Sequence, residues 1–261
     1  CAIYSTFLQR GFDQLVHDVA IQQLPVVFCI DRAGVVGADG PTHHGAYDVS
    51  YLRSIPNLII SSPLNEQDLR DMMFTASEFD EAAWAIRYPR GASTGMILRD
   101  GFEEIAIGKG KKIRDGEYIA IATFGPIGKY AIEVCEAYAA KGIQIAHYDM
   151  RFAKPIDSQL LNEIAVKFDH LITLEDASVL GGFGGAVAEY YATLDMESIA
   201  DASTRENISF PPRLHMMGLP DRIIEHGTQR ELHDEVGIGP DGLKKKIDVI
   251  LALQKIPEFS S

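Results

Sequence analysis

Cysteine, positive charge and long hydrophobic runs are all scarce in this chain of 261 residues. The three cysteines are far apart and two fall in apolar segments, which favours buried free thiols in a reducing, cytoplasmic setting over disulfides. With 24 Lys and Arg against 37 Asp and Glu, the net charge of −13 argues against a nucleic-acid or anionic-membrane partner. The apolar runs are far too short to span a membrane.

An initiator methionine is also absent. The chain begins CAIYSTFLQRGFDQ, and its first residues have the pattern expected for the end of a buried strand. We therefore expect this sequence to be the C-terminal part of a longer protein.

What the chain does contain is an alternation of short apolar runs and amphipathic segments. Continuous apolar runs are typical of parallel strands covered on both faces, and several segments between them have helical spacing. One such helix, with Asn65 as its cap, places Leu69, Met72, Met73 and Ala76 on one face. The expected strands lie at residues 24–30, 57–61, 82–88, 117–125, 143–150, 170–176 and 213–219.

The alternation is interrupted between Gly91 and Gly116, where glycine, lysine and aspartate break the pattern. This interruption predicts an α/β protein of two tandem doubly wound domains with mainly parallel sheets. We expect the first domain at residues 1–93, a linker at 94–116 and the second domain at 117–261.

The loop DRAGVVGADGPTHHGAYD, residues 31–48, combines ionisable side chains with several glycines. It follows the C-terminal end of a predicted parallel strand, where open α/β sheets bind ligands. Arg32 and Asp39 flank glycines that would let the backbone approach a ligand, but a solvated loop with an Arg–Asp pair explains the composition equally well. Arg87 and Arg90 end another strand, and forked guanidinium donors at strand ends could share one phosphate.

Three shorter motifs favour no separate chemistry. GASTG (91–95) matches a nucleophile elbow, but no helical face follows it. GGFGGAV (181–187) lacks the last glycine of a dinucleotide fingerprint, so we expect close backbone packing at a helix start. The adjacent His43 and His44 should diverge and have no third ligand at a useful spacing, so we expect no metal site made by this chain alone.

Longer segments of the chain resemble a known family. These are YSTFLQRGFDQLVHDVAIQQLPV (4–26), the loop at 31–48, IRYPRG (86–91), DMRFAKPID (149–157) and GLPDRIIEHGTQRELHDEVG (218–237). Together they resemble the 1-deoxy-D-xylulose-5-phosphate synthases of the transketolase superfamily, in the same order over essentially the whole chain.

The resemblance implies that the chain holds most of a pyrimidine-binding domain, without its first strands, and a C-terminal domain. The family uses thiamine diphosphate with Mg²⁺. By this resemblance, the diphosphate and metal ligands and the glutamate that activates the cofactor would lie outside the chain. The fragment alone is therefore expected to be inactive, and the full-length enzyme to be a homodimer.

The activity that the resemblance implies is condensation of pyruvate with D-glyceraldehyde 3-phosphate to 1-deoxy-D-xylulose 5-phosphate and CO2, for isoprenoid, thiamine and pyridoxal synthesis. The acceptor phosphate would be bound by Arg32 and Arg90. Catalytic roles beside the acceptor would fall to His43 and Asp39. The remaining matched residues are Tyr4 and Arg10, which would line the same pocket, and Phe7, which would pack on the aminopyrimidine.

Two alternatives stay open. One is another member of the superfamily, either a transketolase or the pyrimidine-binding subunit of a 2-oxo acid dehydrogenase. The other is a catalytically dead module that serves only assembly.

Overall fold

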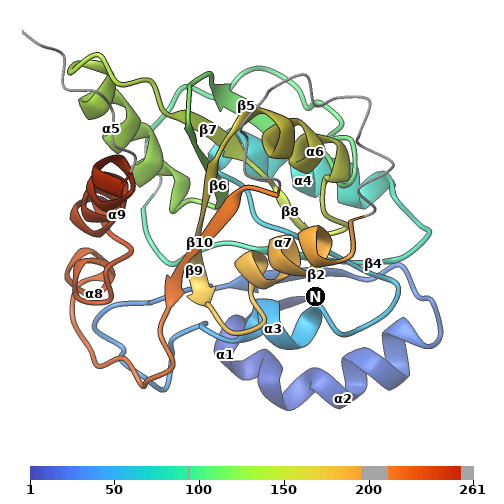
Figure 1. Ribbon diagram of the computed structural model, residues 1–261. Helices are drawn as coiled ribbons and strands as arrows, with labels where there is room; N and C mark the ends of the chain where they lie inside the picture. The colour runs from blue at the N-terminus through green and yellow to red at the C-terminus, as the bar shows by residue number, and fades with distance from the viewer. Residues whose placement is uncertain (93–94, 195–210, 254–261) are drawn as a thin grey trace, which may run out of the picture.

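The computed structural model describes residues 1–92, 95–194 and 211–253 and contains two five-stranded sheets (Figure 1). The first sheet has the order β1-β2-β4-β3-β8, in which β1 to β4 are parallel and β8 is antiparallel to β3. Its strands are β1 (Ala2–Tyr4), β2 (Val27–Asp31), β3 (Leu58–Ser61), β4 (Ala83–Arg87) and β8 (Phe152–Lys154). The helical elements of this half are α1 (Ser5–Leu8), η1 (Gln9–Gly11), α2 (Phe12–Gln14), η2 (Leu15–Ala20), α3 (Asp48–Leu52) and α4 (Glu66–Glu78).

The second sheet has the order β10-β9-β6-β7-β5, with only β5 antiparallel to its neighbour. Its strands are β5 (Lys111–Arg114), β6 (Ile119–Phe124), β7 (Ala146–Asp149), β9 (His170–Ser178) and β10 (Arg213–Leu219). Its helices are α5 (Gly128–Ala139), α6 (Ser158–Lys167), α7 (Phe183–Ala192), α8 (Gln229–Glu235) and α9 (Pro240–Leu253). The predicted pair of α/β domains with mainly parallel sheets is confirmed.

Two strands lie where the sequence analysis placed none. Lys111–Arg114, expected in the linker, form edge strand β5, and Phe152–Lys154 leave the second domain to join the first sheet as β8. Both are short edge strands without the apolar run of a buried strand, so their pairing depends on partners distant in sequence. The expected boundary at 93–94, which includes Ser93 of GASTG, lies outside the described residues.

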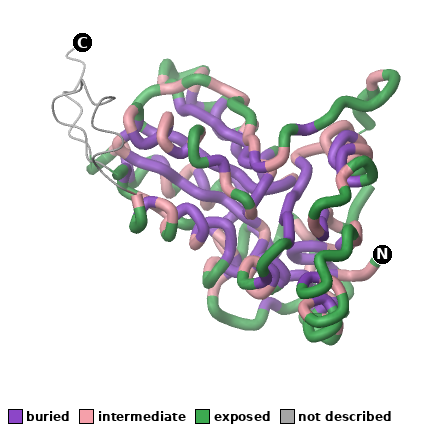
Figure 2. Tube along the Cα trace, turned by 90° about the vertical axis from the view of Figure 1, so that its right-hand side faces the viewer, coloured by how far each residue is buried: buried purple, intermediate pink, exposed green. Residues whose placement is uncertain are grey.

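The central strands form as their apolar sequences predict. Every residue of β3 and β4 is buried, as in a parallel strand covered on both faces, and Figure 2 shows buried residues along the interior of the molecule. The predicted cap of α4 is also present, since the Asn65 side chain accepts a hydrogen bond from the Asp68 N–H at 2.9 Å. Within the described residues, no helix is both long and apolar enough to cross a bilayer.

Each face of the second sheet packs against its own helices (Figure 1). Ile119 and Ile121 of β6 belong to a cluster with residues of α5 and α9. The alternating Ala120, Ala122 and Phe124 belong to another cluster with residues of α6 and α7, and this cluster continues into the first domain. The two domains therefore share an apolar core, which fixes how the carboxyl ends of their strands face each other.

Candidate functional site at the domain interface

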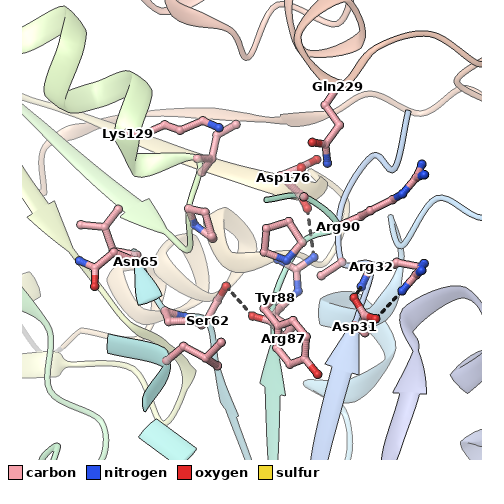
Figure 3. Close-up of a pocket in the computed structure, with 18 of the residues that line it drawn as sticks. Asp31, Arg32, Ser62, Asn65, Arg87, Tyr88, Arg90, Lys129, Asp176 and Gln229 are labelled. Carbon is pink, nitrogen blue, oxygen red and sulfur yellow. Dashed lines mark hydrogen bonds and ion pairs between the residues drawn. The ribbon is translucent and has the colours of Figure 1, made fainter. Parts of the chain in front are cut away.

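A cleft of about 630 Å³ opens where the strand ends of the two sheets meet (Figure 3). This volume is in the range of small-molecule sites, roughly 300–1,000 Å³, and carboxyl ends of parallel strands are where open α/β sheets bind ligands. The first domain lines it with residues at or after the ends of β2, β3 and β4, including Asp31, Arg32, Ala33, Ser62, Pro63, Leu64, Asn65, Arg87, Tyr88, Pro89 and Arg90. The second domain contributes residues from β6, the β6–α5 turn, α5, β9 and α8, including Phe124, Ile127, Lys129, Asp176, Gln229 and His233.

Arg32 stands at the end of β2 in a constrained conformation. Its φ of 58° is in the left-handed region, which few residues other than glycine adopt. The Asp31 carboxylate holds it there, accepting the Arg32 backbone N–H at 2.6 Å and pairing with the guanidinium. The guanidinium carbon also lies 3.8 Å from the centroid of the Tyr4 ring. The structure therefore holds this positive charge at the cleft edge by contacts on two sides.

Arg90 enters the same cleft from the segment that follows β4 (Figure 3). Its Nη1 lies 3.1 Å from Asp39 Oδ2 and donates to the Val36 carbonyl at 3.1 Å. Both partners belong to the loop at 31–48, so this loop supplies one arginine of the cleft and orients the other. The loop does contain an Arg–Asp pair, between Arg32 and Asp31, and Asp39 pairs with Arg90 from outside the loop.

Three aromatic rings continue this group away from the cleft. Tyr4 and Phe7 stack with centroids 5.5 Å apart, and the His43 ring meets Phe7 edge-on at 5.7 Å. Phe7 is 45% exposed, so part of its side chain is accessible to a ligand. His43 Nδ1 lies 2.9 Å from the Thr42 hydroxyl.

Six of the seven predicted site residues are thus linked by direct contacts or by the shared cleft, although Arg32 and Arg90 alone line it. Arg10 is the exception. It is exposed on η1, and its side chain makes no hydrogen bond or ion pair with any residue that the structure describes.

The loop at 31–48 is folded back on itself. Gly34 and Gly45 form an antiparallel bridge, with N–H···O distances of 2.9 and 2.7 Å. His44 is buried beneath it: Nδ1 accepts the Val36 N–H and Nε2 donates to the Glu225 carbonyl, each at 3.1 Å. His43 and His44 therefore point to different partners, as expected for adjacent residues of a turn.

Arg87 is not available for a phosphate, in contrast to the sequence interpretation that arginines at strand ends could share one. Its guanidinium is buried and makes two hydrogen bonds to Asp48, at 3.0 and 3.1 Å, and a third to the Asp176 carbonyl at 3.0 Å. Burial alone would lower the pKa of Arg87, but the neighbouring Asp48 carboxylate raises it above its ordinary value. Arg87 thus joins the floor of the cleft to the second domain.

Sequence reasoning named no site residue in the second domain, although that domain lines part of the cleft. The Asp176 carboxylate accepts a hydrogen bond from the Val35 N–H, and its other oxygen lies 3.0 Å from Nε2 of His233. Nδ1 of His233 is in turn within hydrogen-bond distance of the Tyr130 hydroxyl. Lys129 makes no ion pair with a described carboxylate. Their positions were the available signal, because Lys129 lies shortly after β6 and Asp176 lies near the end of β9, two apolar strands whose carboxyl ends reach this cleft.

A buried carboxylate lies next to Asp176. Burial raises the pKa of Glu175 to about 7, although its oxygens accept the N–H groups of Phe183 and Gly184 at 2.6 and 2.8 Å. A Cβ on Gly184 would lie 2.7 Å from the Thr173 hydroxyl. The glycine motif at 181–187 is therefore confirmed as close backbone packing at the start of α7.

The cofactor implied by the resemblance has a partial fit. The exposed ring of Phe7, supported by Tyr4, is a surface on which a pyrimidine could stack. For a diphosphate-bound metal ion, no group of three or more His, Cys, Asp or Glu side chains exists among the described residues. The residues present thus suit the ring end of thiamine diphosphate, and its metal-bound end would need other ligands.

Comparison with known proteins gives matches over both domains. Residues 1–94 match the family described as transketolase, pyrimidine binding domain, and residues 108–243 match the transketolase C-terminal domain. The 1-deoxy-D-xylulose-5-phosphate synthase of Bacteroides fragilis is 47% identical over 248 residues, covering 95% of this chain and 36% of that protein. For the synthase of Bacteroides thetaiotaomicron, the values are 44% over 266 residues, 100% of this chain and 39% of that protein.

Among solved structures, a split gene transketolase, described as an inactive beta4 tetramer, aligns with a TM-score of 0.78. Its sequence identity is 24%, and the alignment covers 97% of this chain and 76% of that one, so the likeness concerns the fold. The chain spans 36–39% of the length of the two synthases.

Proposed function

Because this chain belongs to the transketolase family, we propose that it forms the acceptor-substrate side of the active site of a 1-deoxy-D-xylulose-5-phosphate synthase. The proposed reaction condenses pyruvate with D-glyceraldehyde 3-phosphate and releases CO2. Thiamine diphosphate would supply the electron sink for decarboxylation. The chain's own residues would bind and orient the aldehyde.

One observation carries this proposal: Arg32 and Arg90, from the ends of neighbouring strands, line a single cleft. A dianionic phosphate accepts strong charge-assisted hydrogen bonds from guanidinium groups, often two from one arginine. Asp31 and Asp39 already pair with these arginines and keep them oriented. We assign the phosphate of the acceptor to this pair.

His43 is assigned to the aldehyde end of the acceptor. In the tautomer in which Nδ1 accepts a hydrogen bond from the Thr42 hydroxyl, the ring carries its hydrogen on Nε2. That N–H can donate to the aldehyde oxygen as it gains negative charge during carbon–carbon bond formation. Following the family resemblance, Asp39 is assigned to a substrate hydroxyl and Phe7 to the aminopyrimidine. Tyr4 and Arg10, which do not line the cleft described above, are assigned to the wall of the acceptor pocket on the resemblance alone.

We also propose that residues beyond these 261 complete the active enzyme. Support comes from the 36–39% share of the synthases that the chain spans and from the partial fit of thiamine diphosphate and Mg²⁺ described above. A homodimer is proposed as the active assembly, on the resemblance to the synthase family.

The test is the Michaelis constant of each substrate in an active enzyme that includes this chain. Arg32→Ala and Arg90→Ala should raise KM for D-glyceraldehyde 3-phosphate about ten- to hundredfold, since a hydrogen bond to a charged group contributes about 1.5–3 kcal/mol. KM for pyruvate should stay near its wild-type value. Arg222→Ala is the control, because Arg222 pairs with Glu235 outside the lining of the cleft. Equal increases for both substrates would remove the arginines from the phosphate site.

A further inference from the structure

Side chains of the second domain form hydrogen bonds with the backbone of Val35, in the loop that carries Arg32 and Asp39. The Val35 N–H donates to Asp176 Oδ1 at 3.1 Å, and its carbonyl accepts from Gln229 Nε2 at 2.8 Å. Val35 itself is fully buried. Both backbone polar groups of this residue are thus satisfied by side chains that lie 141 and 194 positions away in the sequence.

The contacts of Val35 extend to the arginine of the proposed phosphate site. The next residue, Val36, accepts the Arg90 guanidinium through its carbonyl. The Val36 N–H donates to His44, whose other ring nitrogen bonds the Glu225 carbonyl of the second domain. A displacement of Val35 would therefore move the atom that orients Arg90, together with Asp39 on the same loop.

Glycines let the loop lie directly on the second domain. Gly34 has a φ of 78°, and a Cβ at this position would overlap the Asp176 carboxylate. Gly37 has a φ of 88°, and its Cβ would lie 3.1 Å from the Gly227 carbonyl. Residues 225–229 and Asp176 thus form one continuous support under the loop.

The bond from Gln229 to Val35 is separate from the capping of its own helix. Gln229 is the first residue of α8, but the cap is a box made by Thr228 and Glu231, in which each side chain accepts a backbone N–H. Truncation of Gln229 would leave this cap in place. Its side-chain amide therefore serves the loop of the other domain.

We propose that Gln229, with Asp176, is a positioning residue for acceptor binding, and that the second domain fixes the loop so that Arg90 and Asp39 face the cleft. This inference rests on the proposed function. It gives the C-terminal domain a part in substrate recognition without direct contact to the phosphate.

The test compares Gln229→Ala and Gln229→Glu with wild type in an active enzyme that includes this chain. Loss of one neutral hydrogen bond corresponds to about a three- to tenfold change, so Gln229→Ala should raise KM for D-glyceraldehyde 3-phosphate by that factor. Gln229→Glu should raise it at least as much, because a carboxylate would face the Val35 carbonyl. KM for pyruvate should not change. KM for unphosphorylated D-glyceraldehyde should rise less than KM for the phosphorylated aldehyde, since it depends on Asp39 but not on the phosphate-binding arginine.

Gln159→Ala is the matched control, because the Gln159 amide bonds Lys109 on the exposed surface of α6. Its melting temperature and that of Gln229→Ala should fall by similar small amounts. Unchanged kinetics in Gln229→Ala, while Arg90→Ala raises KM, would overturn the positioning role and leave the proposed function standing. If Gln229→Ala instead raised KM equally for all substrates and greatly lowered the melting temperature, the role of Gln229 would be purely structural, and the proposal would also be overturned. Unchanged KM in Arg90→Ala would refute the proposed function itself.

Discussion

Replacing Asp48 by alanine should destabilise the protein more than any surface substitution. Asp48 is 0% exposed and Arg87 is 2% exposed, and two hydrogen bonds of 3.0 and 3.1 Å join them. Arg87 keeps its charge after the substitution, because arginine is not deprotonated in proteins. Removing one partner of a buried ion pair leaves the other charge uncompensated, at a cost of about 3–5 kcal/mol.

The loss should be visible as a lower free energy of unfolding in urea. The single tryptophan, Trp84, is buried in β4 and reports the unfolding of the sheet that contains Arg87. Glu235→Gln is the control, since Glu235 and Arg222 are each 47% exposed and such pairs contribute about 0.2–1 kcal/mol. Asp48→Leu combined with Arg87→Met should recover part of the loss, because neither member of the pair is left as an uncompensated charge.

A loss below about 1 kcal/mol for Asp48→Ala would refute this reasoning, since it is far smaller than the cost of a bare buried charge. The same result would mean that water reaches Arg87 once the carboxylate is gone.

Two further predictions concern other titratable groups. Burial, with the nearby Asp68, raises the pKa of Asp149 from 3.8 to about 7, so the folded state binds the proton more tightly and stability falls as pH rises through that range. Asp149→Asn should reduce this fall in the free energy of unfolding by about 2–3 kcal/mol between about pH 5 and about pH 8. The prediction is contradicted if the free energy of unfolding of the variant, measured by urea titration at each pH, falls with pH as steeply as that of wild type. His43→Ala should slow product formation on the order of 10²-fold yet cost at most about 1 kcal/mol of stability, measured by steady-state rate and melting temperature. Normal turnover in this variant, or a much lower melting temperature, would make His43 structural.

Local sequence was sufficient for the central strands and for one helix cap. Strands β3 and β4 are buried on both faces, so their apolar runs identify them without knowledge of their partners. The Asn65 cap acts on Asp68, only three residues away. Strand β8 pairs with β3 across the domain boundary, and nothing within Phe152–Lys154 encodes that partner.

The site shows the same division between local and distant information. The ends of β2 and β4 are neighbours in the sheet, which agrees with the expectation that arginines at strand ends could share one phosphate, while the choice of Arg32 and Arg90 came from the family resemblance. Arg87 could not be separated from them, because its partner Asp48 is 39 residues distant. The role of Gln229 could not be predicted for a further reason. Its side chain donates to a backbone carbonyl, and every residue has one, so the sequence does not mark the partner.

The most direct test of the central claim is calorimetric titration of the 261-residue chain with D-glyceraldehyde 3-phosphate and with D-glyceraldehyde. If Arg32 and Arg90 form the phosphate site, the phosphorylated aldehyde should bind at least about tenfold more tightly, and Arg90→Ala should remove most of this difference. Equal affinity for the two aldehydes, or a preference for phosphate that Arg90→Ala leaves intact, would contradict the account.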